Sequence, residues 1–305
     1  MTTHQPFLGL VAATHTPFLG DGSLNLPVVE RQAEYLLSNG VQSVFICGTT
    51  GESHSLSCDE RRQLSDRWLD VARGTPLRVI VHVGSNCLGD AKLLAAHAQK
   101  RGAAAVAAVA PSYFKPRSVA ELIECCAVVA GAAPEALFYY YDIAAMTNIG
   151  LPISELLDQV TARIPNFAGI KFTGNDMTAL QLCLNAQGGR YDILSGYDEG
   201  LLAALALGAR GFVGSTYNFA APIYHRLMER FSAGDMAAAR EEQFRSAQLV
   251  ALLSGYGFMA AAKATMGAIG VEVGPPRLPH NRLTTDQLAR LRDELEQLGY
   301  FDWIA

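Results

Sequence analysis

Charged side chains are scarce in this sequence, making up 17% of its 305 residues, and acidic residues outnumber basic ones by 29 to 24. The formal charge of −5 leaves no strongly basic face, so neither nucleic acid nor an anionic membrane is expected as a partner. Apolar residues make up 50% of the chain, which is enough for a large core. The length favours one barrel-sized domain with an extension over two independent domains.

Residues with the spacing of a metal site are also lacking. The six cysteines show no paired metal spacing, and the seven histidines include no His-x-x-x-His pair. We therefore expect no metal and no other cofactor, and thiols that stay reduced in the cytoplasm. Residues 1–7 lack the basic start and apolar core of a signal peptide, and no segment approaches membrane-spanning length. We expect a soluble protein that is not exported.

What the sequence does contain is a regular alternation of short apolar runs and helical stretches. Eight runs are expected to be strands, at residues 10–17, 43–49, 78–84, 105–110, 136–141, 169–173, 192–196 and 211–215. The helical stretches between them are residues 26–38, 58–72, 89–100, 119–130, 154–164, 177–187 and 200–207. Ser57 with Glu60, and Ser118 with Glu121, have the spacing of capping boxes at two helix starts. Glycines that follow helices as stop residues are Gly40, Gly74, Gly102, Gly131 and Gly208.

Eight strand and helix units in one chain predict an α/β fold, a closed (β/α)8 TIM barrel, because parallel strands need both faces covered. An open doubly wound sheet is the alternative, and the lack of Gly-x-Gly-x-x-Gly after the first strand weakens its dinucleotide-binding form. Residues 222–231 should close the barrel, and residues 235–254, 258–269 and 285–298 should form appended helices. We expect residues 1–232 to be the barrel that carries the active site and residues 233–305 to be a C-terminal helical bundle.

A lysine on the sixth expected strand is the strongest chemical signal. Lys171 lies in the apolar run Phe-Ala-Gly-Ile-Lys-Phe-Thr-Gly of residues 167–174, with no acidic neighbour. Burial there would disfavour the charged amine, and a neutral amine can attack a carbonyl carbon. A lysine whose amine reaches water from a strand end is the commoner case, and this alternative stays open.

Polar residues follow the other expected strands, and in a (β/α)8 barrel all these ends lie at the catalytic face. Residues 48–52 read Gly-Thr-Thr-Gly-Glu, a turn whose glycines and hydroxyls suit a carboxylate or a phosphate. Strand alternation puts Tyr139 and Tyr141 on one face, so this phenol pair can face the barrel mouth. Other residues near these ends are Thr173, Gly196, Asp198, Glu199 and Ser215.

Each of these residues also has an ordinary structural explanation. The threonines suit a helix-entry turn, aromatic residues in strands usually serve packing, and acids before a helix favour its N-terminus. We expect His82 in the core or behind the site rather than as a base, and no Ser-His-Asp order is evident. Glu52 and Glu199 could form the paired carboxylates of a glycosidase. An amine, a phenol and an anion-binding turn suit imine chemistry on an α-keto acid better.

Four motifs resemble those of one family. They are Gly-Thr-Thr-Gly-Glu at residues 48–52, Tyr141 followed two residues later by Ile143, Lys171 in Gly-Ile-Lys-Phe, and Gly-Phe-Val-Gly-Ser-Thr-Tyr-Asn at residues 211–218. On these motifs the sequence resembles the N-acetylneuraminate lyase and dihydrodipicolinate synthase superfamily of class I, pyruvate-handling aldolases, over about residues 9–279. Patterns at residues 9–14, 138–141 and 274–279 are similar to those of the N-acetylneuraminate lyase branch.

The resemblance implies a (β/α)8 barrel with C-terminal helices, assembled as a homotetramer that is a dimer of dimers. It implies that Lys171 forms a Schiff base with the keto carbon of a small keto acid and that Tyr141 is the general acid/base. By the same resemblance, Thr49 and Thr50 bind the substrate carboxylate and help relay protons. The residues that meet the sugar hydroxyls in such lyases correspond here to Thr173, Gly196, Asp198, Glu199 and Ser215.

The sequence departs from the family pattern at a few positions. The family's Tyr-Asn-Ile-Pro is Tyr-Asp-Ile-Ala at residues 141–144, and its following glycine is Asn148, so the shape of this loop is open. The synthases have an arginine where this chain has Met146, which counts against a dicarboxylate product. Phe114 stands where many members have a tyrosine that reaches across the subunit interface.

The predicted function is that of a class I aldehyde-lyase that cleaves N-acetylneuraminate to N-acetylmannosamine and pyruvate. Alternatives are an aldolase or dehydratase of another 2-keto-3-deoxy sugar acid, and a pyruvate condensation like that of dihydrodipicolinate synthase. A keto-acid-binding protein without catalysis and a glycosidase are further hypotheses.

Overall fold

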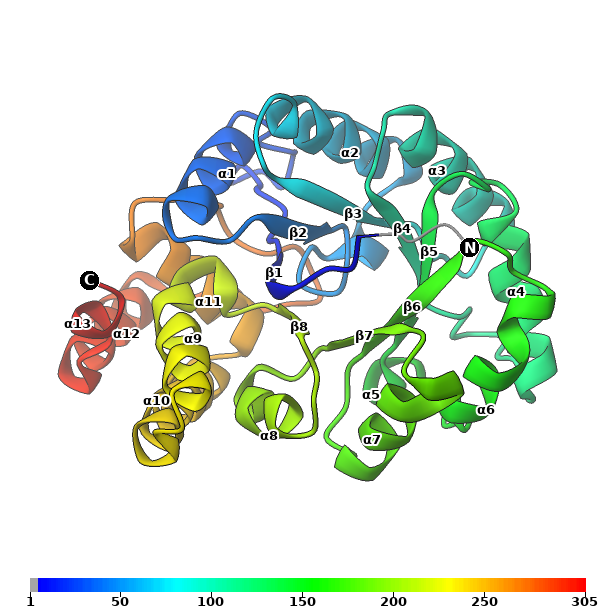
Figure 1. Cartoon of the computed structure of the whole chain (residues 1–305). Coiled ribbons are helices and arrows are strands. Elements are labelled where there is room, and N and C mark those ends of the chain that lie inside the picture. The colour runs from blue at the N-terminus through cyan, green and yellow to red at the C-terminus, as the bar shows by residue number, and fades with distance from the viewer. Residues whose placement is uncertain (1–4) are drawn as a thin grey trace.

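Parallel strands close into a barrel in the computed structural model, which describes residues 5–305 (Figure 1). Within that range the strands follow one another in chain order around the barrel, and β8 pairs with β1 to close it. The strands are β1 (Gly9–Ala13), β2 (Ser43–Ile46), β3 (Arg78–His82), β4 (Ala105–Ala108), β5 (Leu137–Asp142), β6 (Phe167–Phe172), β7 (Asp192–Ser195) and β8 (Gly211–Gly214). The predicted fold class is therefore confirmed, and the open doubly wound alternative is wrong.

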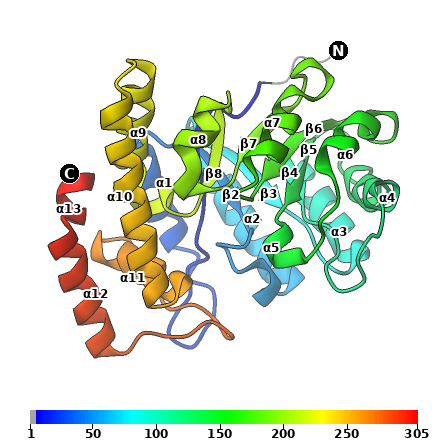
Figure 2. The ribbon, with the colours of Figure 1, turned by 90° about the horizontal axis from the view of Figure 1, so that it is seen from below.

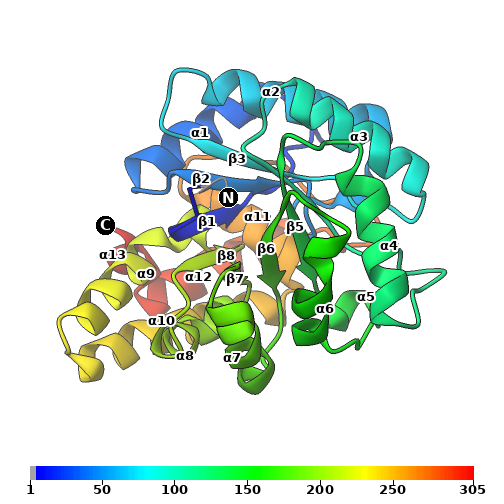
Figure 3. The same ribbon diagram turned by 45° about the vertical axis from the view of Figure 1, so that its right-hand side comes forward.

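The helices surround the barrel, and the last ones gather beside it (Figures 1 and 2). Their bounds are α1 (Val28–Ser38), α2 (Cys58–Ala72), α3 (Leu88–Lys100), α4 (Val119–Ala130), α5 (Ala144–Thr147), α6 (Ile153–Gln159), α7 (Met177–Asn185), α8 (Leu201–Ala206), α9 (Tyr217–Ser232), α10 (Met236–Gly255), α11 (Phe258–Ala268), α12 (Thr285–Leu298) and α13 (Tyr300–Ile304). Figure 3 shows α4 and α6 covering the strands near β5. The short helices α5 and α13 were not expected from the sequence.

The strands are buried on both faces, which explains why they read as apolar runs rather than as alternating patterns. One core fills the barrel and includes Val11, Phe45 and Val213. A second, larger core lies between the barrel and the helices and includes Leu10, Val44 and Phe212. Successive residues of one strand therefore contribute to different cores, as the period of two requires.

The predicted caps are formed with one difference. Ser57 and Glu60 make both bonds of a capping box at the start of α2. Ser118 Oγ accepts a hydrogen bond from the Glu121 amide, but the Glu121 carboxylate accepts from the Arg117 amide, so that box is half formed. The helix predicted at residues 222–231 begins earlier, at Tyr217, and is irregular at Ala220, just before a proline that cannot donate to the helix.

The C-terminal helices are packed against the barrel's last helix. Helices α10, α11 and α13 all contact α9, and only three residues separate the end of α9 from the start of α10. The division of the chain between residues 232 and 233 stays a prediction. Residues 1–4, which belong to the predicted barrel part and to the segment predicted to lack a signal peptide, lie outside the described residues.

No single helix within residues 5–305 is long and apolar enough to cross a membrane. Helices α10 and α11 satisfy the length and composition criteria only together, as a pair bent by 113°.

Candidate active site

Lys171 lies on β6 with its side chain inside the barrel mouth. It is 4% exposed, and its Nζ atom is 3.9 Å from the centre of the Tyr141 ring and 4.3 Å from that of Phe45. In the β5–β6 pairing, Tyr141 stands directly beside Lys171. The amine is therefore enclosed by aromatic rings rather than extended into bulk water, which excludes the ordinary strand-end alternative.

The Tyr141 hydroxyl meets the turn that follows β2. Tyr141 is 2% exposed, and its hydroxyl lies 3.1 Å from Thr49 Oγ1. Thr50 Oγ1 lies 2.6 Å from Ser215 Oγ, at the end of β8. Hydroxyls at the ends of β2, β5 and β8 thus form two pairs, and one of them includes the tyrosine whose ring lies against the amine. Such groups can hold a carboxylate and pass protons.

The turn after β2 has a backbone that only particular residues allow. Cys47 and Glu52 both have left-handed backbone, at φ +55° and +54°. A Cβ at Gly48 would lie 2.7 Å from the Phe45 ring, which explains the glycine there. Left-handed residues other than glycine are strained and cluster at functional sites, so the turn is held in shape by its surroundings.

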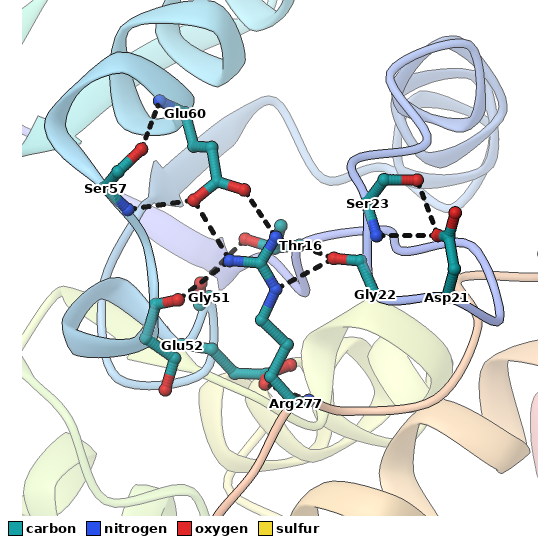
Figure 4. A network of polar contacts seen from close by, with 10 residues as sticks. Thr16, Asp21, Gly22, Ser23, Gly51, Glu52, Ser57, Glu60 and Arg277 are labelled. Atoms are coloured by element: carbon teal, nitrogen blue, oxygen red, sulfur yellow. Dashed lines mark hydrogen bonds and ion pairs between the residues drawn. The ribbon is translucent and has the colours of Figure 1, made fainter.

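Much of that support comes from the C-terminal part of the chain. Glu52 is buried and accepts hydrogen bonds from Lys263 Nζ at 2.9 Å and from the Arg277 amide at 2.8 Å. The Arg277 guanidinium pairs with Glu60 and donates to the Gly22 carbonyl (Figure 4). The buried Glu52 carboxylate is paired with the Lys263 amine, so the alternative of a glycosidase with Glu52 as a free carboxylate is wrong.

His82 lies behind Tyr141, as expected from the sequence. Its Nδ1 donates to the Cys47 carbonyl at 2.7 Å, and its Nε2 accepts from the Val109 amide. Burial, with nearby Arg61 as a second cause, holds the pKa of His82 well below its ordinary value. The ring is neutral with both nitrogens engaged, so it supports the Cys47 backbone and the Tyr141 ring and is not a base.

Of the predicted phenol pair, only Tyr141 reaches the mouth. Tyr139 shares its face of β5, but its hydroxyl donates to Asp192 Oδ2 at 2.8 Å, at the start of β7. The start of a barrel strand lies at the end opposite the catalytic face. The prediction that both phenols face the mouth is therefore wrong. Residues two apart on one strand share a face of the sheet, but they lie at different positions along the barrel axis.

The loop after β5 has a well-defined shape despite its departures from the family pattern. Residues 144–147 form helix α5, and Asn148 ends it with left-handed backbone at φ +58°. Asparagine tolerates this conformation better than most residues, so it can replace the family's glycine. Met146 is 66% exposed and lines a cavity of about 170 Å³ beside Thr49.

The residues predicted to meet sugar hydroxyls lie at the ends of β6, β7 and β8. A Cβ on Gly196 would lie 2.1 Å from Thr173 Oγ1, so only glycine fits there. Among residues 5–305, Thr173 Oγ1 is a buried atom without a hydrogen-bond partner, and such an atom is suited to a ligand hydroxyl. Burial raises the pKa of Glu199, and the neighbouring Asp198 raises it further.

Asp198 is turned toward the start of α9. Its Oδ2 accepts from the Thr216 amide at 2.9 Å and from Thr216 Oγ1 at 2.7 Å. Burial raises the pKa of Asp198, while the Thr216 bonds and the charge of Lys171 act to lower it. Thr216 was not predicted as a partner of Asp198, although it lies next to Ser215 in the motif at residues 211–218.

A metal is not suggested by the donor groups. Within the part of the chain that the structure describes, no three His, Cys, Asp or Glu residues are close enough together to hold a metal ion. The arrangement instead provides an enclosed amine, an adjacent phenol and an array of hydroxyls, which can form and process an imine.

Many known proteins are similar to this chain in sequence or structure, and several of them are N-acetylneuraminate lyases. A model of the dihydrodipicolinate synthetase family matches residues 6–298. The N-acetylneuraminate lyase of Gallus gallus is 40% identical over 99% of both chains, and that of Mus musculus is 38% identical over 96% of this chain and 92% of its own. The solved N-acetylneuraminate lyase of Proteus mirabilis is 38% identical and superposes with a TM-score of 0.94, covering 97% of this chain and all of its own.

Proposed function

The chain belongs to the dihydrodipicolinate synthetase family, and we propose that it is a class I aldolase that cleaves N-acetylneuraminate into N-acetylmannosamine and pyruvate. The observation that carries this proposal is the enclosed Lys171 amine beside the Tyr141 ring, with the Tyr141 hydroxyl 3.1 Å from Thr49 Oγ1. The near-complete alignment with N-acetylneuraminate lyases supports the choice of substrate within the family.

The proposed reaction begins at the keto carbon of the open-chain sugar acid. Thr49 and Thr50 hold the substrate carboxylate, and Lys171 attacks C2. Tyr141 donates its proton to the departing C2 oxygen, which leaves as water and gives a protonated imine and a Tyr141 phenolate. The phenolate then removes the proton of the C4 hydroxyl, the C3–C4 bond breaks, and its electron pair moves into the imine to form an enamine. N-acetylmannosamine leaves. Protonation of the enamine at C3 and hydrolysis of the imine release pyruvate and restore the lysine.

The roles of the remaining site residues follow from their positions. We propose that Thr173, Gly196, Asp198, Glu199 and Ser215 bind the hydroxylated part of the sugar chain. Polar groups buried around such a ligand reject analogues that lack its hydroxyls, because the protein groups would then be unpaired. The exposed Met146 offers no positive charge for a second carboxylate, which favours the lyase over a synthase.

Two wider properties remain proposals. We propose the homotetramer that the resemblance implies, supported by Phe114, an aromatic residue that is 86% exposed in the single chain and packs edge-on against the exposed Tyr113.

We also propose a cytoplasmic location, with which the six free cysteines are compatible.

Borohydride trapping tests the amine. Reduction in the presence of pyruvate should add the mass of one reduced pyruvate adduct to the protein, at Lys171. Lys171→Ala should lose both the adduct and the release of pyruvate from N-acetylneuraminate, whereas Lys92→Ala, a substitution of an exposed lysine, should lose neither. A protein that binds keto acids without catalysis would gain no covalent mass.

A phenylalanine substitution tests the phenol. General acid/base assistance is worth about 10²- to 10⁴-fold, so Tyr141→Phe should form the adduct and cleave N-acetylneuraminate more slowly by about that factor. Tyr139→Phe is the matched control, because it removes a buried hydroxyl of the same strand at the opposite end of the barrel. If wild-type protein releases no pyruvate from N-acetylneuraminate but cleaves a shorter 2-keto-3-deoxy sugar acid, the proposed substrate is wrong and the chemistry stands.

A further inference from the structure

A line of buried hydroxyls joins Asp198 to a helix of the C-terminal bundle. Thr216 Oγ1 lies 2.7 Å from Asp198 Oδ2 and 2.6 Å from the Tyr224 hydroxyl, which lies 2.6 Å from Ser246 Oγ on α10. Thr216, Tyr224 and Ser246 are fully buried. Asp198, Thr216, Tyr224 and Ser246 thus form one connected series, the Asp198 hydrogen-bond chain.

The ionised carboxylate determines the direction of every proton in this chain. A carboxylate only accepts, so Thr216 must donate its single hydroxyl proton to Asp198. The Tyr224 hydroxyl must then donate to Thr216, and the Ser246 hydroxyl must donate to Tyr224. Hydrogen bonds that point the same way polarise and strengthen one another. Starting at Ser246 on α10, each hydroxyl therefore donates to the next, and the last proton is donated to Asp198. If Asp198 were protonated, the hydroxyls would no longer be forced to point in this direction.

The same helix also holds the backbone of the Asp198 turn. Gln243 on α10 donates to the Asp198 carbonyl at 3.3 Å and accepts from the Leu202 amide at 2.8 Å. A Cβ on Gly214 would lie 2.2 Å from Asp198 Oδ1, so the carboxylate is also closely packed against β8. Helix α10 therefore fixes both the backbone and the side chain of Asp198.

We propose that Tyr224 and Ser246 are positioning residues that keep the Asp198 carboxylate ionised and oriented, so that helix α10 sets the preference of the site for a hydroxylated substrate. This inference rests on the proposed function. A carboxylate can accept about four hydrogen bonds, so acceptor capacity remains after Thr216 for substrate hydroxyls. Neither Tyr224 nor Ser246 touches the substrate in this proposal, because both lie behind Thr216.

The charges around Asp198 favour a role for such donors. Burial raises the pKa of Asp198, and Glu199 beside it is a like charge. Lys171 on β6 is the positive group that lowers the pKa, and the hydroxyls of Tyr217 and Tyr224 on α9 face it as neutral groups. The hydrogen bonds from Thr216 lower the pKa of Asp198, so weakening the Thr216 hydroxyl as a donor would raise that pKa further.

Removal of single hydroxyls tests the proposal. In Tyr224→Phe and Ser246→Ala, the acid limb of kcat/KM for N-acetylneuraminate should move to higher pH by at most about 0.5–1 unit. This upper bound is the free energy of one complete hydrogen bond, and these residues act on Asp198 only through Thr216. The loss should appear in KM more than in kcat and should fade at high pH. Borohydride trapping with pyruvate, which has no hydroxylated chain, should be unchanged.

A double variant separates a connected chain from two local defects. If Ser246 acts through Tyr224, Tyr224→Phe/Ser246→Ala should shift the limb no further than Tyr224→Phe alone. Tyr300→Phe is the matched control, because its buried hydroxyl donates to the Phe219 carbonyl on the same helix α9 but lies outside the chain. It should leave the pH profile of kcat/KM unchanged.

Two results would overturn the inference while the proposed function survives. One is a wild-type pH profile in both single variants. The other is a Tyr300→Phe shift equal to that of Tyr224→Phe, which would show a general effect of lost tyrosine bonds. Failure of the proposed function is a different result, namely no pyruvate from N-acetylneuraminate with the wild-type protein. The same variants would then be compared on whichever sugar acid the wild-type enzyme cleaves.

Discussion

Asp142 is a carboxylate at the end of β5, next to Tyr141 in sequence but facing the helices. It is buried, and burial raises its pKa from 3.8 to about 7. The unfolded chain would lose this proton near pH 4, whereas the folded chain keeps it to near pH 7. The contribution of Asp142 to stability is therefore greatest at low pH and is lost as the pH rises from about 4 through 7, by up to about 1.4 kcal/mol per pH unit.

His15 has the opposite dependence. Its ring is fully buried, and burial, with Lys263 as a second cause, lowers its pKa from 6.5 to about 3. The unfolded chain takes up a proton below pH 6.5 while the folded chain does not, so this contribution is lost as the pH falls from 6.5 toward 3. Between about pH 4 and 6.5, the effects of Asp142 and His15 on the pH dependence of stability therefore partly cancel, which hides each effect in the wild-type protein.

Replacing Asp142 with asparagine should reveal this balance. Asp142→Asn should be more stable than wild type at pH 8, because it removes a buried charge, and the difference should shrink as the pH falls to 5. The midpoint of urea unfolding at several pH values measures it. Asp293→Asn, on the exposed surface of α12, is the control. An equal gain in both variants, or no gain at pH 8, would contradict the assignment.

At the scale of elements, helix α11 is tied to the turn after β2 by a buried ion pair. Lys263 Nζ lies 2.9 Å from Glu52 Oε1 and also donates to the Thr16 and Pro275 carbonyls. Burial lowers the pKa of Lys263, whereas Glu52 acts to raise it. Because Glu52 has left-handed backbone just after Thr49 and Thr50, this pair fixes the proposed carboxylate-binding turn from the C-terminal side.

Loss of one partner of this pair should be costly. Glu52→Gln leaves the Lys263 amine buried without its counter-charge and should lower the free energy of unfolding by about 3–5 kcal/mol. Glu52→Gln/Lys263→Met removes both charges and should recover most of that loss. Denaturant titration measures both. Glu34→Gln breaks the exposed pair with Arg31 and should change stability by at most about 1 kcal/mol. A Glu52→Gln loss as small as that of Glu34→Gln would contradict this account.

At the scale of the whole molecule, helices and side chains of the C-terminal part contact the barrel at several places. Helix α9 contacts β1 of the barrel and also contacts α10, α11 and α13. Lys263 and Arg277 reach back to the turn after β2. We therefore propose that the parts at residues 1–232 and 233–305 form one cooperative folding unit, although they have distinct positions.

The two tryptophans allow a direct test of this unit. Trp68 is buried on α2 of the barrel, and Trp303 lies on α13. In Trp303→Phe the fluorescence reports the barrel, and in Trp68→Phe it reports the C-terminal helices. Each fluorescence midpoint should coincide with the circular dichroism midpoint of the same variant, which controls for any change of stability. Separate midpoints would show that the two parts unfold independently.

Local pattern in the sequence was enough to determine much of the architecture. Buried parallel strands read as apolar runs, and each predicted run overlaps an observed strand. The alternation of strand faces correctly separated Tyr141, inside the barrel, from Tyr140, which packs toward the helices. The order of the strands made Lys171 and Tyr141 neighbours, because sequential parallel strands pair in a barrel.

Tertiary structure alone decided what each polar group meets. The period of two gives the face of a residue but not its height in the barrel, so Tyr139 was assigned to the mouth and lies at the other end. Glu52 meets Lys263 from 211 positions away, and Asp198 reaches Ser246 only through Thr216 and Tyr224. Such partners come from segments that are far apart in the sequence and are brought together by packing. A local sequence pattern does not show which distant residue each polar group will contact.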